Sequence, residues 1–297
     1  MMKQTVLSIL LFNLILSGCK KEEAVPENKI VFEGAQKVSV KGYTDDLMEP
    51  FLSTDGSILI FNNSNDPSVN TNLHWATRID DLTFEYKGEV IGVNTASLEG
   101  VATMDKNGIL YFVSTRDYNQ TLATVYKSNF LNGTATNVSQ VEGISKNQAG
   151  WVNFDVEINS SGEFLYFVDG RFDQSGGPYE ADIVIAQKTN DKFQRLPNSD
   201  EILENINTDA LEYAACISAN NLELYFTRLD VPISATSMPQ IFVSSRNNTN
   251  EPFGLPVKIQ SISGFVEAAT ISPDGNTLYY HKRDNNKFAL YLTRRVN

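Results

Sequence analysis

Apolar and polar residues follow one pattern that recurs five times along this chain. Each copy begins with an acidic residue and a short apolar stretch, passes through a polar turn, and ends in a second apolar stretch that closes on an aromatic residue. Two apolar runs joined by a tight turn predict a β-hairpin. The copies are EPFLSTDGSILIF (49–61), EGVATMDKNGILYF (99–112), DVEINSSGEFLYF (155–167), EYAACISANNLELYF (212–226) and EAATISPDGNTLYY (267–280).

The turns and the closing aromatic residues indicate that the five copies are repeats of one structural unit. Four of the turns carry glycine and the fourth copy carries Asn221 instead, and both residue types accept a positive φ readily. Such regular recurrence is typical of a repeat architecture. The aromatic residues follow one another at intervals of 51, 55, 59 and 54 residues: Phe61, Phe112, Phe167, Phe226 and Tyr280.

Further strands complete each repeat. Third strands are predicted at 73–79, 122–128, 181–188, 240–246 and 288–295, and weaker fourth strands at 85–93, 136–141, 193–196 and 256–259. The fifth repeat ends after its third strand, and residues 31–40 resemble the segment before the fifth repeat. Pairing of 31–40 with 288–295 predicts an all-β fold: a five-bladed β-propeller of four-stranded antiparallel blades, closed by the N-terminal strand. An open β-sandwich or two separate domains are the alternatives.

One of the turns carries a family resemblance. The segment ISPDGNTLYY, with Ser272-Pro273-Asp274-Gly275, resembles the signature of WD-like repeats in TolB-type β-propellers, and Ser53-Thr54-Asp55-Gly56 is close to it. The resemblance extends over all five repeats and implies a propeller fold, because this signature marks a turn and carries no function. Proteins of this kind are often periplasmic or outer-membrane binding and scaffold components. Some five-bladed propellers are instead glycoside hydrolases.

The N-terminal residues predict an export signal. A positive start at 1–3 precedes an apolar run at 6–16, which is too short to span a bilayer and is typical of a signal peptide. The following Leu16-Ser17-Gly18-Cys19 resembles a bacterial lipobox, in which Cys19 would be lipidated. We therefore divide the chain into a lipoprotein signal peptide (1–18), a lipidated cysteine with a flexible tether (19–29) and the propeller (30–297). An ordinary secretory signal with an incidental cysteine is the alternative.

The tether bears on localisation. Lys20-Lys21-Glu22-Glu23 resembles the surface-export signal of Bacteroidetes lipoproteins, although a charged, solvated tether would look the same. We expect an outer-membrane lipoprotein, periplasmic or surface-exposed, that is attached to the membrane through its N-terminal lipid.

Composition narrows the function classes. The formal net charge of -12 argues against nucleic acid, because a phosphate backbone requires clustered lysine and arginine. With 41% hydrophobic residues the chain can bury a substantial core. If Cys19 is lipidated, Cys216 has no partner for a disulfide and is expected to be a small buried residue.

The repeated acidic residues are the candidate ligand site. They lie near the start of each predicted innermost strand, where the central channel of a propeller opens. Together they would form a negatively charged mouth suited to a cation, an amine or sugar hydroxyls. The candidates are Glu49, Glu99, Asp155, Glu212 and Glu267.

Arginine follows the second strand in four repeats, at Arg116, Arg171, Arg228 and Arg283. Each is expected beside the acid of its own repeat, where Arg–carboxylate pairs would hold the blades together. The first repeat has no such arginine. We therefore predict that Glu49, with Asp66, marks the more reactive sector of the mouth.

Aromatic residues offer a second contact type. Trp151 precedes Asp155 at the entry to the third repeat, and the glycine-rich segment 169–180 is expected to form a loop that reaches over the channel. An aromatic face there could stack on a saccharide or peptide, although packing between blades explains it equally.

These features predict a cell-envelope protein that binds a ligand or a protein partner on its channel face. The alternative is a glycan-active hydrolase or lyase that uses mouth carboxylates, for example Glu49, Asp155 and Glu212. A ligand-free scaffold in an envelope complex is a third possibility. No cofactor and no metal are expected, since His74 and His281 are the only histidines and neither has a ligand spacing.

Overall fold

The computed structural model describes residues 30–66 and 68–296. The all-β class is confirmed: apart from the single-turn helices α1 (Tyr118–Thr121) and α2 (Ser199–Ile202), the regular elements of these residues are strands. No helix in this part of the chain is long and apolar enough to cross a membrane. The predicted signal peptide, Cys19 and the tether lie outside the described residues and stay predictions.

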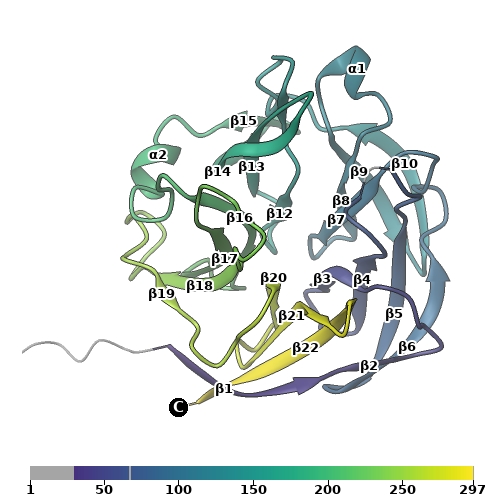
Figure 1. The fold of residues 1–297 in the computed structure, drawn as a ribbon. Helices are drawn as coiled ribbons and strands as arrows, with labels where there is room; N and C mark the ends of the chain where they lie inside the picture. The colour runs from purple at the N-terminus through teal and green to yellow at the C-terminus, as the bar shows by residue number, and fades with distance from the viewer. Residues whose placement is uncertain (1–29, 67, 297) are drawn as a thin grey trace, which may run out of the picture.

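Each predicted repeat forms a group of hydrogen-bonded strands, arranged around a common centre (Figure 1). The innermost strands are β3 (Met48–Leu52), β7 (Glu99–Met104), β12 (Val156–Ile158), β16 (Leu211–Ile217) and β20 (Val266–Ile271). The second strands are β4 (Ile58–Asn62), β8 (Ile109–Ser114), β13 (Phe164–Asp173), β17 (Glu223–Leu229) and β21 (Thr277–Asp284). The third strands are β5 (Leu73–Asp80), β9 (Val125–Leu131), β14 (Gly176–Thr189), β18 (Gln240–Ser245) and β22 (Lys287–Val296). The fourth strands are β6 (Thr83–Glu89), β10 (Thr134–Gln140), β15 (Lys192–Arg195) and β19 (Val257–Lys258), and β11 (Trp151–Val152) extends the third repeat.

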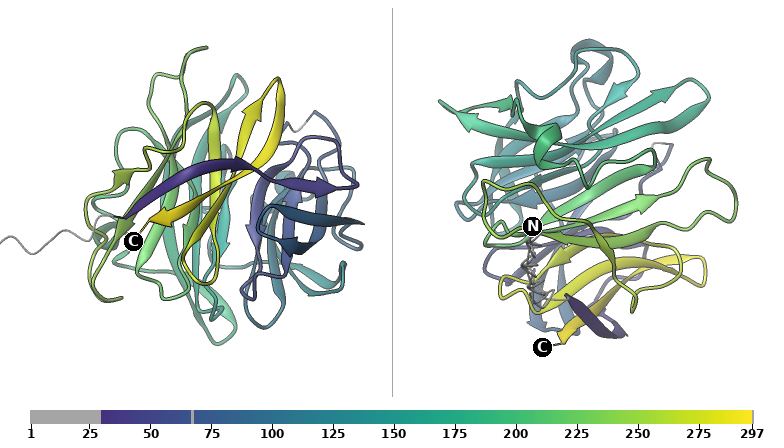
Figure 2. Two further views of the ribbon diagram at one scale, coloured as in Figure 1. Left: turned by 90° about the horizontal axis from the view of Figure 1, so that it is seen from below. Right: turned by 90° about the vertical axis from the view of Figure 1, so that its left-hand side faces the viewer.

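The N-terminal strand β1 (Val31–Lys37) pairs antiparallel with β22, so this predicted pairing is confirmed. Figure 2 shows β1 lying along the yellow C-terminal strand. The predicted strand 31–40 is broken at Val38, whose N–H donates to the carbonyl of Leu290. The chain then forms β2 (Ser39–Lys41), which pairs in parallel with β6. One short segment therefore joins the fifth repeat to the first.

Hydrophobic clusters lie between neighbouring repeats. The five closing aromatic residues are all buried to within 1% of complete exclusion from solvent, which explains their regular recurrence. One cluster joins the fifth repeat to the first through Leu59, Phe61 and Tyr279, and others join the remaining neighbours. The innermost strands also contact one another in sequence, from β3 through β7, β12, β16 and β20 back to β3.

Two local predictions are wrong. The third strand of the second repeat begins at Val125, because α1 and the left-handed Leu122 occupy the preceding residues. Segment 169–180 is a hairpin and not an open loop: β13 and β14 stay paired as far as Asp173 and Gly176. Gly176 and Gly177 have positive φ angles, which make the tight turn possible and let both strands extend beyond the neighbouring sheet.

Burial of Phe32 gives a direct test of the N-terminal pairing. Phe32 is 3% exposed, its ring meets Tyr225 edge-on at 6.1 Å, and Arg295 lies over it at 5.1 Å. We expect Phe32→Ala to lower the free energy of unfolding by about 3 kcal/mol, measured by urea denaturation. Leu255→Ala, at a side chain that is 80% exposed, is the control. Equal stability of the two variants would contradict a packed role for β1.

Candidate functional site

Four of the five innermost strands have a bulge. Each has a register shift and one non-glycine residue in the left-handed region: Glu49, Val101, Ala214 and Ala268, with φ between 48° and 52°. This conformation is strained for such residues and needs support from its surroundings.

Side chains of the preceding repeat supply that support. The N–H of Glu49 donates to Nδ1 of His281 at 3.0 Å, and the N–H of Val101 donates to Oδ1 of Asn62 at 3.1 Å. In the same way Ala268 donates to Thr227 at 3.1 Å, and Ala214 donates to the carboxylate of Asp155. The His281 contact makes the fifth repeat the partner of the first.

A second set of side chains lies further along the innermost strands. Each accepts a hydrogen bond from a backbone N–H of the innermost strand in the next repeat, because these strands diverge and leave such N–H groups without a sheet partner. The pairs are Leu52 to Thr270 (3.2 Å), Ile158 to Thr103 (3.3 Å), Ile217 to Glu157 (3.3 Å) and Ile271 to Cys216 Sγ (3.5 Å). Cys216 is thus a buried acceptor, consistent with the small buried residue that the sequence predicts.

The bulges surround a small central cavity of about 30 Å³, lined by all five repeats. Glu49 and Asp155 lie at its wall, together with the alanines of β16 and β20. A second small cavity of about 50 Å³ lies toward the turns at Ser53 and Ser272. Glu157 lines both, so its side chain lies between the two cavities.

Four of the predicted acids occupy three different positions relative to the bulge of their strand, and Asp155 belongs to the strand without a bulge. Glu49 is itself the left-handed residue, and Asp155 directly precedes β12. Glu267 lies one residue before its left-handed neighbour, whereas Glu99 and Glu212 lie two residues before theirs. Because each one-residue step along a strand reverses the side chain's direction, the acids cannot share one environment.

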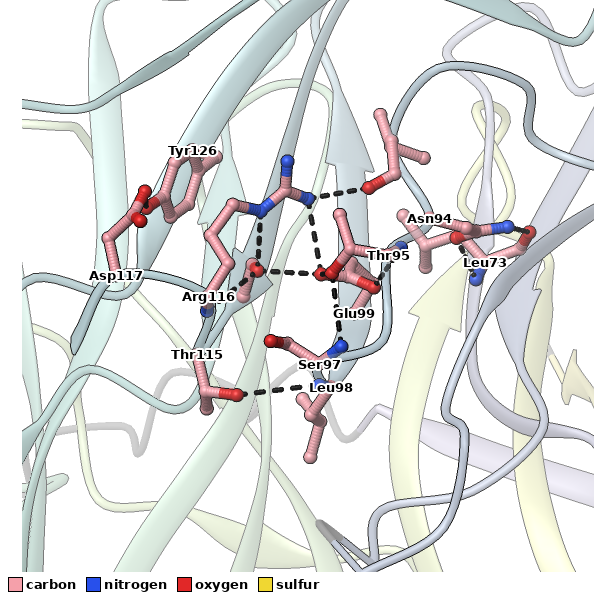
Figure 3. Close-up of polar contacts among 12 residues, drawn as sticks. Leu73, Asn94, Thr95, Ser97, Leu98, Glu99, Thr115, Arg116, Asp117 and Tyr126 are labelled. Atoms are coloured by element: carbon pink, nitrogen blue, oxygen red, sulfur yellow. Dashed lines mark hydrogen bonds and ion pairs between the residues drawn. The ribbon is translucent and has the colours of Figure 1, made fainter. Parts of the chain in front are cut away.

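Glu99 holds its repeat together (Figure 3). It is fully buried and accepts from the N–H and the hydroxyl of Thr95, both at 2.8 Å, and from Arg116 at 3.2 Å. Arg116 also donates to the carbonyl of Val93 and lies 4.9 Å from the ring centre of Tyr126. The predicted pairing of Arg116 with Glu99 is confirmed.

Glu212 repeats this arrangement. It is fully buried and accepts from the hydroxyl of Thr208 at 2.7 Å and from Arg228 at 2.6 Å, while Arg228 also donates to the carbonyl of Ile206 at 2.7 Å. The pairing of Arg228 with Glu212 is confirmed. Full burial and a cationic partner leave Glu99 and Glu212 no free oxygen for a ligand.

The other two predicted pairings are wrong. Arg171 lies on the extended hairpin and pairs with Glu180 at 2.6 Å instead of Asp155, because β13 carries it beyond the centre. In the third repeat Arg195 takes the equivalent role, binding Asp169 at 2.7 and 2.8 Å. Arg283 is exposed, and Glu267 contacts a histidine in its place.

Glu267 belongs to a largely buried polar cluster next to Glu49. His281, fully buried, contacts Glu267 Oε2 through Nε2 at 3.2 Å. Its Nδ1 accepts a hydrogen bond from the N–H of Glu49, so Nε2 carries the ring proton and donates a hydrogen bond to Glu267. The hydroxyl of Tyr213 donates to Oε1 of the same carboxylate. Three repeats therefore bring Glu49, Glu267, His281 and Tyr213 together.

Two carboxyl oxygens at this cavity have no hydrogen-bond partner: Oε2 of Glu49 and Oδ1 of Asp155. Burial, followed by the nearby Glu49, raises the pKa of Asp155 well above its usual range. Burial also raises the pKa of Glu49, while a hydrogen bond from Asn65 at 2.6 Å opposes that rise. Orphaned buried oxygens are costly, and they mark a place where a ligand's donors would be accommodated.

Asp66 and Trp151 lie outside this cluster. Asp66 is exposed and accepts from Ser68 at 2.7 Å in a local turn, so Asn65 and not Asp66 contacts Glu49. Trp151 is half-buried, and the ammonium of Lys146 lies 3.1 Å from its ring centre. That face of the indole is therefore occupied by a cation.

The buried carboxyl group of Glu157 is expected to make the free energy of unfolding depend on pH. Burial raises its pKa to about 7, from an ordinary value of 4.5. Between these two values the folded state keeps a proton that the unfolded state has lost, so stability falls as pH rises through this window. The loss amounts to about 3 kcal/mol. Urea denaturation at pH 5 and pH 8 should show a smaller loss for Glu157→Gln than for the unchanged protein, and equal losses would contradict the assignment.

No cluster of three or more His, Cys, Asp or Glu side chains able to hold a metal ion occurs among residues 30–66 and 68–296. Tyr213 and His281 were missed at the sequence level because they reach across repeats, to Glu267 and to the N–H of Glu49 respectively, and Asn65 because it reaches Glu49 from the loop after β4. One sequence signal was the histidine within β21, where the other repeats place uncharged residues.

Comparison with known proteins identifies the fold. No protein-family model matches the sequence, and no curated protein sequence matches it. The structure is similar to a family 117 glycoside hydrolase of the marine bacterium Zobellia galactanivorans, with a TM-score of 0.55, 10% identity, and 90% of each chain covered. It is also similar to a thermostable family-43 glycoside hydrolase, with a TM-score of 0.53, 12% identity, and 87% of this chain and 92% of that chain covered. A TolB protein from Agrobacterium tumefaciens gives a TM-score of 0.50 at 11% identity, with 88% of this chain and 79% of that chain covered.

At these identities the likeness concerns the fold alone. The chain has a β-propeller fold, in a class that includes both glycoside hydrolases and TolB proteins. Function has to be argued from the site.

Proposed function

We propose that this protein is a glycan-active hydrolase whose site is built on Glu49, Asp155 and Glu267 at the centre of the molecule. The observation that carries the proposal is that Glu49 and Asp155 line the central cavity with one unpartnered oxygen each, while Glu267 lies close enough to both to act on their charge. Glycoside hydrolysis needs carboxyl groups in different protonation states around one bond. The fold shared with two glycoside hydrolases supports this reading over ligand binding alone.

Distinct environments give the carboxyl groups distinct roles. Asp155 is the proton donor, because burial and the neighbouring Glu49 favour its protonated form. Glu267 is oriented by donors at both oxygens, from Tyr213 and His281. In the proposed reaction Asp155 gives its proton to the glycosidic oxygen as the bond to the anomeric carbon breaks, and Glu267 takes a proton from the water that attacks that carbon.

We also propose that the propeller has five blades and is closed by β1. Pairing of β1 with β22, the contacts between β3 and β20, and the bond from Glu49 to His281 support closure between the fifth repeat and the first. Closure matters for function because it brings the carboxyl of the first repeat to that of the fifth.

The proposal is tested by hydrolysis assays on a panel of plant and algal oligosaccharides and aryl glycosides. Turnover that is lost in Asp155→Asn and Glu267→Gln supports it. Saturable binding without turnover by the unchanged protein would instead support the second candidate, a glycan-binding protein, which the same orphaned oxygens favour.

A further inference from the structure

The first repeat arranges its polar contacts without arginine. After β4 the chain continues as Asn62-Asn63-Ser64-Asn65, where the second and fourth repeats lead to Arg116 and Arg228. Two of these asparagines contact each other, and one of them reaches Glu49. An amide replaces a guanidinium at this carboxylate, so Glu49 receives a donor without a neutralising charge.

The backbone N–H of Val101 fixes which atoms donate and which accept along this chain of hydrogen bonds. The N–H of Val101 donates to Oδ1 of Asn62 at 3.1 Å, and a backbone N–H can only donate. Asn62 must therefore present its amide nitrogen elsewhere, and this donates to Oδ1 of Asn65 at 2.9 Å and to the carbonyl of Ser64 at 2.7 Å. With its oxygen engaged, Asn65 presents its nitrogen to Oε1 of Glu49 at 2.6 Å.

We infer that Asn65 is a positioning residue for the proposed site: it holds Oε1 of Glu49 and leaves Oε2 at the cavity to accept a hydroxyl of the glycan. Oε2 is buried, has no partner, and belongs to a residue that lines the cavity. This inference rests on the proposed function for the identity of the ligand. The hydrogen-bond chain itself does not depend on it.

Other charged groups also face Glu49. His281 and Glu267 approach from β21 and β20, and Asp155 approaches from the entry to β12. Asn65 differs from these groups because it is exposed, lies on a surface loop, and acts on the carboxylate through one hydrogen bond. It can therefore be changed without altering the buried cluster.

The test measures the pKa of the Glu49 carboxyl in the ligand-free full chain by carbon-13 NMR, with Glu49→Gln to assign the signal. Loss of a donor to a charged group should raise this pKa by about one to two pH units in Asn65→Ala and Asn65→Asp. Asn70→Ala, at an exposed position of the same loop, should leave it unchanged.

An unchanged Glu49 pKa in both Asn65 variants would overturn the inference and leave Asn65 as an ordinary loop residue. A raised pKa supports it, and a parallel shift in the pH dependence of glycan turnover supports the link to the ligand. A raised pKa in a protein with no turnover on any glycan would reject the proposed function while retaining the role of Asn65.

Discussion

Asp155→Asn is expected to lower kcat for natural oligosaccharides by about 10²- to 10⁴-fold, the usual contribution of a general acid, if the proposed hydrolysis takes place. The reason is that asparagine fills the same buried place but has no acidic proton to give to the departing sugar oxygen. Aryl glycosides with acidic phenols need little protonation of the leaving group. The same variant should therefore keep most of its activity on these substrates, which identifies the lost function as proton donation.

Two further variants complete this experiment. Glu267→Gln should lose activity on both substrate types, because the group that activates water is needed whatever the leaving group. Asp66→Asn is the control, since Asp66 is exposed and contacts only its own turn. Equal losses for Asp155→Asn on both substrate types would contradict its role as the acid. A loss of turnover in Asp66→Asn would support the sequence-based prediction that Glu49 and Asp66 together form the more reactive sector.

Glu99→Ala is expected to lower the free energy of unfolding by about 3–5 kcal/mol, because it leaves the cation of Arg116 without its carboxylate in a buried network. The same holds for Glu212→Ala and Arg228. Urea denaturation measures the loss. Neither variant should alter glycan turnover under conditions where it stays folded, since neither carboxylate has an oxygen free for a ligand.

Arg171→Ala supplies the matched comparison. Arg171 and Glu180 form an ion pair of 2.6 Å, the same length as that of Arg228 with Glu212. Both of its side chains are about half exposed, and such pairs contribute about 0–1 kcal/mol. A Glu99→Ala variant as stable as Arg171→Ala would show that the buried network does not hold its repeat together. A double-mutant cycle with Arg116→Ala would then show whether the two residues couple at all.

Much of the fold was predictable because its hairpins follow from patterns of neighbouring residues in the sequence. Two apolar runs around a turn define each hairpin, and the regular return of one aromatic residue reports a core between neighbours. The strand deficit of the fifth repeat pointed to β1, and the pairing with β22 followed. Arg116 and Arg228 were placed correctly beside their acids because both partners lie on one hairpin. The same reasoning failed for Arg171, which pairs with Glu180, and for Arg283, which is exposed.

The site was not predictable in the same way. A bulge shifts the register by one residue, which turns an acid from one environment to another while the sequence spacing hardly changes. Glu99 and Glu267 look alike in the sequence, each with an arginine after the second strand, yet Glu99 is paired with Arg116 and Glu267 contacts His281. His281, Tyr213 and Asn65 reach the acids at the centre across repeats or from a loop, and no local pattern reports such contacts.

The sequence by itself determined the repeat, the hairpins, the N-terminal pairing and the two arginine pairings, because these depend on neighbours within one repeat or on matched strand patterns. Only the tertiary structure decided which acids meet at the centre. That choice depends on where the innermost strands bulge and on which side chain of the preceding repeat accepts the bulged N–H. These contacts form when the repeats pack around one axis, since this packing brings residues 39, 41 and 232 positions apart within hydrogen-bond distance.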